Sequence, residues 1–192
     1  MAGHPDRLHY TGNPEADRLL TTEPIALLIG FALDQQVTLQ KAFSGPLDLR
    51  ARIGHLDPAR IAAMDPEELE RAFRARPALH RFPSAMARRV QALCAVVVDE
   101  YGGDASRIWR EARDGADLQA RLRALPSIGP LKTQTLSAIL VKQFGLSLPG
   151  LVELLPTHPT LADVQSDADR EAYQARKRAH KAALRAQTAH QR

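Results

Sequence analysis

The chain has 192 residues, of which 44% are apolar and 5% aromatic, and its formal net charge is +4. This length suits one domain, or one domain with a small appendage, and the abundance of Ala, Leu and Arg favours helices over sheets. Because Cys94 is the single cysteine, an intramolecular disulfide, a structural zinc site of thiolates and an iron–sulfur cluster are all excluded. Cys94 itself lies in an apolar run and is expected to be a buried small hydrophobic residue.

No segment of the sequence indicates contact with a membrane. The longest apolar run is too short to span a bilayer, and the residues after Met1 contain no apolar stretch followed by a cleavage site. We therefore expect a cytoplasmic protein. The sequence does not specify an oligomeric state, and a monomer is the simplest expectation.

The first half of the chain contains several clear helix starts. Residues 1–23 mix His, Pro, Asp, Gly and Asn with little periodicity, which predicts a flexible N-terminal arm. Pro24 then opens a segment over 24–33 that is apolar nearly all round, and such a helix is expected to be central and packed on every side. Two Asp-Pro pairs, at 57–58 and 65–66, each place a capping acid before a proline suited to the first helical position.

The second half continues the helical pattern. An apolar stripe predicts a helix over about 85–101, and another helix is expected over about 131–144. Short helical pieces are expected at 150–155 and 160–165, before a polar, basic helix over about 167–188. Because no segment alternates in the manner of a strand, we expect an all-α helical bundle or barrel of about eight to ten short helices.

Basic residues concentrate near the end of the chain. Between Arg170 and Arg192 the sequence has seven Lys or Arg residues and a single acid. This stretch either contacts a polyanion or forms a solvated amphipathic helix. We therefore divide the chain into a flexible arm over 1–23, a helical domain over 24–145, and short helices with a basic tail over 146–192.

The turn before the helix expected at 131–144 is the most informative segment. Residues 125–130 read Leu-Pro-Ser-Ile-Gly-Pro, and Lys132 and Thr133 follow. A tight hairpin at a helix N-terminus leaves several backbone N–H groups without intrahelical partners, and these groups together with the helix dipole favour a phosphate. Gly129 allows close approach of the backbone, and Lys132 can pair with a neighbouring phosphate.

This pattern, Leu-Pro-x-Ile-Gly at 125–129 followed by Lys-Thr at 132–133, resembles the helix-hairpin-helix motif of the HhH-GPD superfamily of base-excision DNA glycosylases, which includes the endonuclease III and adenine glycosylase types. The resemblance extends upstream to the apolar helix that precedes Asp34-Gln35-Gln36, and it covers roughly residues 24–145. It implies a helix-hairpin-helix DNA-binding element, double-stranded DNA as the partner, and removal of a damaged base by nucleotide flipping.

The resemblance also implies a set of DNA contacts. Gln36, with Gln35 beside it, would enter the duplex at the lesion and fill the space of the everted nucleotide, because an amide offers a donor and an acceptor to an orphaned base. Alternatively, the two glutamines simply end a helix in a polar loop. The implied DNA-binding residues are Gln35, Gln36, Pro126, Ser127, Gly129, Lys132 and Thr133. No metal site or cofactor is expected, although the hairpin carbonyls could hold a monovalent cation.

The sequence departs from the family pattern at the catalytic positions. The family uses an Asp after the hairpin helix and, in bifunctional members, a Lys just after the hairpin glycine. Counted from Gly129, that Lys position falls on Leu131, so Lys132 is one residue late. Three roles are open for Lys132: it contacts phosphate, it lies in a solvated helix start, or it acts as a catalytic amine. The Asp position falls near Pro149, where there is no acid. The remaining candidates for catalysis are Asp34, Lys132, Glu153 and Asp163.

Three functions remain open from the sequence. The first is a DNA glycosylase, which the Gln-bearing helix favours. The second is a non-catalytic DNA-binding or damage-sensing module on the same scaffold, which the missing Asp favours. The third is a helical protein–protein adaptor without salt-dependent affinity for DNA. Ser127, which stands at the first glycine of the family's hairpin, is tolerable in either DNA-binding case if its backbone dihedrals are ordinary.

Overall fold

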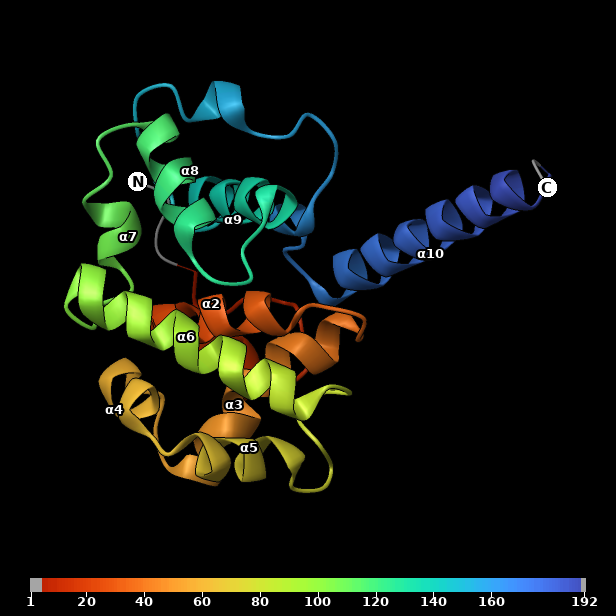
Figure 1. Ribbon diagram of the computed structural model, residues 1–192. Coiled ribbons are helices and arrows are strands. Elements are labelled where there is room, and N and C mark those ends of the chain that lie inside the picture. The colour runs from red at the N-terminus through yellow and green to blue at the C-terminus, as the bar shows by residue number, and fades with distance from the viewer. Residues whose placement is uncertain (1–4, 191–192) are drawn as a thin grey trace.

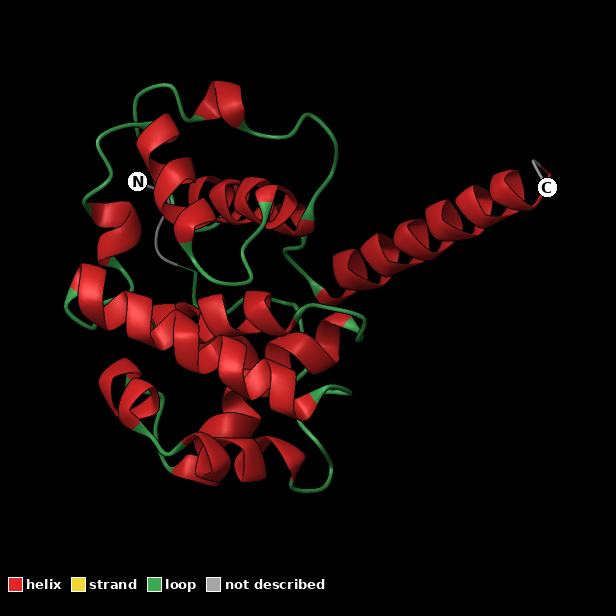
Figure 2. Cartoon of the chain, in the orientation of Figure 1, coloured by secondary structure: helices red, strands yellow, loops and turns green. Residues whose placement is uncertain are grey.

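The computed structural model describes residues 5–190, with side chains described over 5–179. Within this part of the chain the fold consists of helices and loops without strands (Figure 1; Figure 2), which confirms the all-α prediction. Their bounds are α1 Pro14–Thr22, α2 Pro24–Leu33, α3 Leu39–Ile53, α4 Pro58–Ala63, α5 Pro66–Arg74, α6 Pro83–Tyr101, α7 Arg107–Arg110, α8 Gly115–Ala124, α9 Pro130–Lys142, the 3-10 helices η1 Val152–Leu154 and η2 Leu161–Asp163, and α10 Asp167–His190.

Helix α2 lies at the centre, as its sequence predicts. Every residue from Ile25 to Leu33 is buried, and the helix packs against α1, α3 and α6. A Cβ on Gly30 would lie 2.6 Å from the ring of Phe43 in α3, so the missing side chain lets the two helices approach closely. The Phe43 ring also meets Phe31 edge to face, with ring centroids 5.2 Å apart.

The prediction of a flexible N-terminal arm is wrong for residues 8–22. Leu8 and Tyr10 are fully buried, and α1 packs against α2 and α3. The buried carboxylate of Asp17 accepts hydrogen bonds from the backbone N–H groups of Tyr10 (3.1 Å) and of the following residue (2.8 Å). Polar residues that resemble a loop in composition therefore fix this segment to the core. Residues 1–4 of the predicted arm lie outside the described residues.

Several helices begin or end at signals that the sequence contains. Asp57 and Asp65 accept hydrogen bonds from backbone N–H groups in the first turns of α4 and α5, which confirms both capping predictions. Helix α6 packs against α2, α4 and α5, and it ends at Gly102 in the left-handed conformation. Cys94 is fully buried on α6, as predicted, and burial raises the pKa of its thiol to about 12.

Residues after 145 contribute to the same core. The 3-10 helices occupy the two places where short helical pieces are expected, and η2 packs against α9. Leu151, Leu161 and Val164 are buried. Helix α10 then runs outward from the helical body (Figure 1). Over the part of the chain that the structure describes, the helices are too short or too polar to cross a membrane.

Candidate functional site

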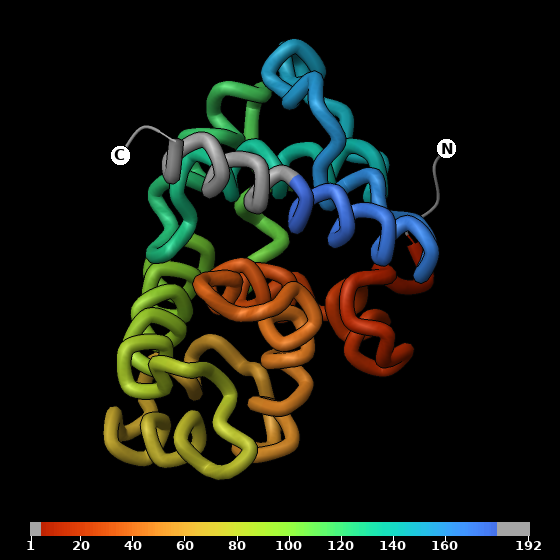
Figure 3. The backbone as a smooth tube through the Cα atoms, turned by 90° about the vertical axis from the view of Figure 1, so that its right-hand side faces the viewer, coloured from red at the N-terminus to blue at the C-terminus, as the bar shows by residue number. Residues whose placement is uncertain are grey.

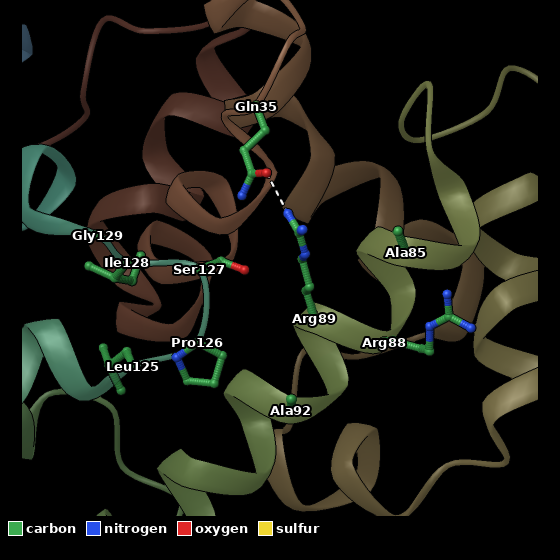
Figure 4. Close-up of a pocket in the computed structure, with 10 residues that line it drawn as sticks. All are labelled: Gln35, Ala85, Arg88, Arg89, Ala92, Leu125, Pro126, Ser127, Ile128 and Gly129. Atoms are coloured by element: carbon green, nitrogen blue, oxygen red, sulfur yellow. Dashed lines mark hydrogen bonds between the residues drawn. The ribbon is translucent and has the colours of Figure 1, made fainter.

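An open groove of about 800 Å³ forms where three segments far apart in the sequence meet (Figure 4). These segments are the loop after α2, the first half of α6, and the hairpin between α8 and α9. The described side chains that line the groove include two arginines and no acid. The polar side chains among the lining residues are those of Gln35, Arg88, Arg89 and Ser127, and the hairpin adds Pro126 and Gly129.

The hairpin is a tight turn closed by backbone hydrogen bonds. The N–H of Ile128 donates to the carbonyl of Leu125 at 3.2 Å, and both side chains are buried. Ser127 has a φ of 69°, so ordinary backbone dihedrals, the condition under which serine is tolerable here, are not met. The turn requires the left-handed region that glycine adopts without strain. The Gly129 carbonyl accepts from Thr133 through both its backbone N–H (2.9 Å) and its hydroxyl (3.1 Å).

Thr133 therefore supports the hairpin from inside. Its side chain is fully buried, and the structure gives it this internal contact in place of the predicted DNA contact. Pro126, by contrast, is half-buried and lines the groove with Ser127 and Gly129.

The N-terminus of α9 opens at this hairpin without a side-chain cap. Gly129 is its N-cap residue, and no side chain accepts a hydrogen bond from the first turn. Pro130 has no N–H, so the donors at this end are the backbone N–H groups of Gly129, Leu131 and Lys132. Gly129 is exposed, and a Cβ added to it would meet nothing within 4 Å. A ligand anion can therefore approach these donors closely.

The ammonium group of Lys132 is turned inward. Its Nζ donates to the carbonyl of Phe31 at 2.6 Å and to the carbonyl of Ser127 at 3.2 Å. Burial lowers the pKa of Lys132, while the carboxylate of Asp34 acts in the opposite direction. The side chain thus joins the end of α2 to the hairpin, and the predicted phosphate contact is replaced by an internal one. It also donates to one of the hairpin carbonyls, that of Ser127, at which a monovalent cation is conceivable from the sequence.

The loop after α2 presents Gln35 to the groove. The side-chain oxygen of Gln35 accepts a hydrogen bond from the guanidinium of Arg89 (Figure 4), and its backbone carbonyl accepts from Nε2 of His80 at 2.9 Å. Gln36 is exposed beside it, with a φ of 55°. By position, the family resemblance implies Gln36 as the residue that enters a duplex. The geometry instead makes Gln35 the glutamine that lines the groove.

His80 fixes this loop as a neutral ring. It is 2% exposed, and burial lowers its pKa. Its Nδ1 accepts a hydrogen bond from the N–H of Phe82 at 3.0 Å, so the neutral ring carries its proton on Nε2 and donates it to Gln35. Both ring nitrogens are therefore satisfied, and the ring joins the segment before α6 to the loop after α2.

Sequence reasoning missed the contribution of α6. Arg88 and Arg89 are both exposed and bring two guanidinium groups to the groove. A signal for them exists, because Ala85, Arg88, Arg89 and Ala92 recur at the spacing of one helical face. That face is turned by about 120° from the apolar stripe of Met86, Val90, Leu93 and Val97.

The acids named as catalytic candidates lie in different surroundings. Asp163 pairs with Lys142 at 2.6 Å and accepts from the N–H of Thr160 at 2.7 Å, so it caps η2 and joins it to α9. Glu153 is exposed in η1. Asp34 directly precedes Gln35 and interacts electrostatically with the Lys132 ammonium. Asp34 is therefore the candidate acid that adjoins the groove.

Comparison with known proteins adds no assignment to this geometry. No family model matches the chain, and no curated protein and no solved structure matches it.

Proposed function

We propose that the chain binds double-stranded DNA at this groove and acts in base excision repair as a DNA glycosylase of the HhH-GPD type. One observation carries the proposal: an uncapped helix N-terminus, two exposed arginines and a positioned glutamine line the same groove. Each of these groups suits a different part of a damaged duplex, namely its phosphates and its unpaired base.

Phosphate binding is supported by two kinds of donor. The N-terminus of α9 offers backbone N–H groups and the positive end of the helix dipole. Arg88 and Arg89 offer planar guanidinium groups, whose geometry matches two phosphate oxygens at once. The absence of acids among the described lining residues avoids repulsion of a polyanion.

Nucleotide flipping is supported by the way Gln35 is held. Its backbone is fixed by His80 and its amide oxygen by Arg89, so the side chain enters the groove in a defined orientation. Its Nε2 also donates to the carbonyl of Ala32 at 3.5 Å, so the amide would exchange these internal partners for the base that loses its own.

Glycosylase chemistry needs one further group. Water adds to C1′ of the sugar, the bond between C1′ and the base nitrogen breaks, and the base leaves with a proton. A carboxylate near the sugar stabilises the positive charge that develops there. We assign this part to Asp34, which does not itself line the groove but directly precedes Gln35 and interacts with the Lys132 ammonium.

A second candidate function is a non-catalytic, damage-sensing DNA-binding module on the same scaffold. It is favoured by the lack of a carboxylate among the described groove-lining residues. It is also favoured by the position of Lys132, whose amine is engaged by two backbone carbonyls.

The DNA-binding part is tested by Gly129→Val. A side chain at this position meets open space, so the fold is retained while close approach of a phosphate is blocked. Loss of one charge-assisted contact worth about 1.5 kcal/mol or more weakens binding about tenfold or more. Ala59→Val, at an exposed position on α4, is the matched control. Fluorescence anisotropy with labelled duplexes gives both Kd values, and equal values for Gly129→Val and wild type would exclude the hairpin contact.

The enzymatic part is tested on duplexes that carry uracil, 8-oxoguanine, alkylated purine, hypoxanthine, oxidised pyrimidine or an abasic site. Strand cleavage that requires hot alkali at one lesion identifies a monofunctional glycosylase. That activity is expected to disappear in Asp34→Asn and to persist in Asp48→Asn, which changes a half-exposed carboxylate on α3 that pairs with Lys41. Binding without cleavage on every duplex supports the second candidate.

A further inference from the structure

Helix α10 carries a basic surface beside the groove. Arg176, Lys177 and Arg178 are consecutive and exposed. On a helix, three consecutive residues cover about 200° of the circumference, so this turn is cationic on most sides. The first turns of α10 lie against residues 37–40 and the start of α9, and the helix then points away from the helical body (Figure 1; Figure 3).

The first turns of α10 are anchored to the helical body. The carboxylate of Asp167 lies 3.6 Å from Nδ1 of His9, in the segment before α1, and the Arg170 side chain is 11% exposed. Tyr173 is half-buried and packs against the hydrophobic core. The ammonium of Lys177 lies over the Tyr173 ring, 5.9 Å from its centroid, which favours one orientation of the lysine. The basic turn therefore has a defined position relative to the groove.

Two hollows flank this turn, and each borders a segment of the groove. The first, of about 330 Å³, lies between Lys177, Arg178 and residues 37–40, which directly follow Gln36. The second, of about 590 Å³, lies between Lys177 and the first turns of α9, where it is lined by Leu131. The cationic surface of α10 is therefore continuous with the loop after α2 and with the uncapped end of α9.

We propose that α10 is a second contact with the backbone of the same duplex, in which Arg176, Lys177 and Arg178 bind phosphates outside the lesion. This inference rests on the proposed function. The groove and α10 would then hold the duplex from two adjacent surfaces. Phosphate contacts carry no sequence information, so this contact acts equally on damaged and undamaged DNA.

The experiment measures Kd against salt concentration for wild type and for a triple variant with Arg176→Gln, Lys177→Gln and Arg178→Gln. Each phosphate neutralised by a cation contributes about 0.9 to the slope of log Kd against log salt. Loss of up to three contacts therefore makes the slope shallower by about two to three units. The ratio of Kd values for damaged and undamaged duplexes is expected to stay unchanged.

The matched control changes three exposed arginines on α1, α4 and α5, with the same loss of net charge. These substitutions are Arg18→Gln, Arg60→Gln and Arg71→Gln, and none of the three arginines lines the groove or the two hollows. The control is expected to keep the wild-type slope. An equal loss of slope in both triple variants would assign the effect to net charge and overturn the α10 contact.

Other outcomes separate the two proposals. If the triple variant keeps the wild-type slope while Gly129→Val still weakens binding, the α10 contact is overturned and the proposed function stays intact. If the triple variant keeps the wild-type slope but differs from wild type in mass by analytical ultracentrifugation, α10 instead pairs copies of the chain and the α10 contact with DNA is overturned. A wild type that does not bind duplex DNA overturns both proposals.

Discussion

Replacement of Lys132 by Met tests whether the hairpin is held to α2 from inside. Met is similar in length but has no donor, so the change removes the hydrogen bonds from Nζ to the carbonyls of Phe31 (2.6 Å) and Ser127 (3.2 Å). A hydrogen bond to a charged group contributes about 1.5–3 kcal/mol. Because Lys132 is only half-buried and water can replace part of each interaction, we expect the free energy of unfolding to fall by about 2–3 kcal/mol.

Urea denaturation followed by circular dichroism measures this change. Thermal unfolding gives a second readout, in which Tm falls by about 4–12 °C at about 2–4 °C per kcal/mol for a chain of this size. Lys142→Met is the matched control on the same helix. Its ion pair with Asp163 is partly exposed, so its loss costs less than about 1 kcal/mol.

One result would refute this reasoning. If Lys132→Met keeps the wild-type free energy of unfolding but binds DNA with a shallower salt slope, the side chain contacts phosphate and the internal hydrogen bonds contribute nothing. The sequence-based expectation would then be right.

Three further changes test other parts of the structure. Ser127→Gly is expected to raise the free energy of unfolding by about 1 kcal/mol, since φ is 69° there; Ser127→Ala keeps the strain and serves as the control. Leu8→Ala is expected to cost about 2–5 kcal/mol in urea denaturation, whereas a flexible arm would show no change. Burial lowers the pKa of His80 below its ordinary 6.5, so the unfolded chain binds this proton more tightly than the folded one. The free energy of unfolding therefore falls as pH drops through 6.5 toward the folded pKa, and His80→Asn should reduce this slope in denaturations at several pH values; an unchanged slope would remove His80 as the source.

Local signals predicted most of the helices. The apolar run of α2 and the Asp-Pro pairs before α4 and α5 depend on neighbouring residues, and all are found where expected. The prediction for the segment before α2 is wrong because its order depends on distant residues. Its order depends on the buried Asp17 and on contacts of Leu8 and Tyr10 with distant helices, and a window along the sequence does not contain those partners.

In the candidate site, too, local motifs are predictable from the sequence and contacts between distant residues are not. The hairpin and the glutamine loop are visible in the sequence, because each is a short motif. The direction of the Lys132 side chain is not, since its acceptor on Phe31 lies 101 residues away. Arg88 and Arg89 become part of the groove only when α6 packs beside the hairpin, so their helical spacing alone does not distinguish a binding surface from a solvated face.

The charges at the ends of two helix dipoles explain where the Lys132 ammonium lies. The C-terminal end of α2 has carbonyls without intrahelical donors and the negative end of its dipole, whereas the N-terminal end of α9 has unpaired N–H groups. Lys132 belongs to the first turn of α9, and its ammonium donates to the carbonyl of Phe31 near the C-terminal end of α2. If the groove binds DNA as proposed, this ammonium would screen a phosphate at α9 from the α2 dipole without touching it. A weaker Kd for Lys132→Met is therefore expected even with an internal lysine, and only the salt slope distinguishes this indirect effect from a lost phosphate contact.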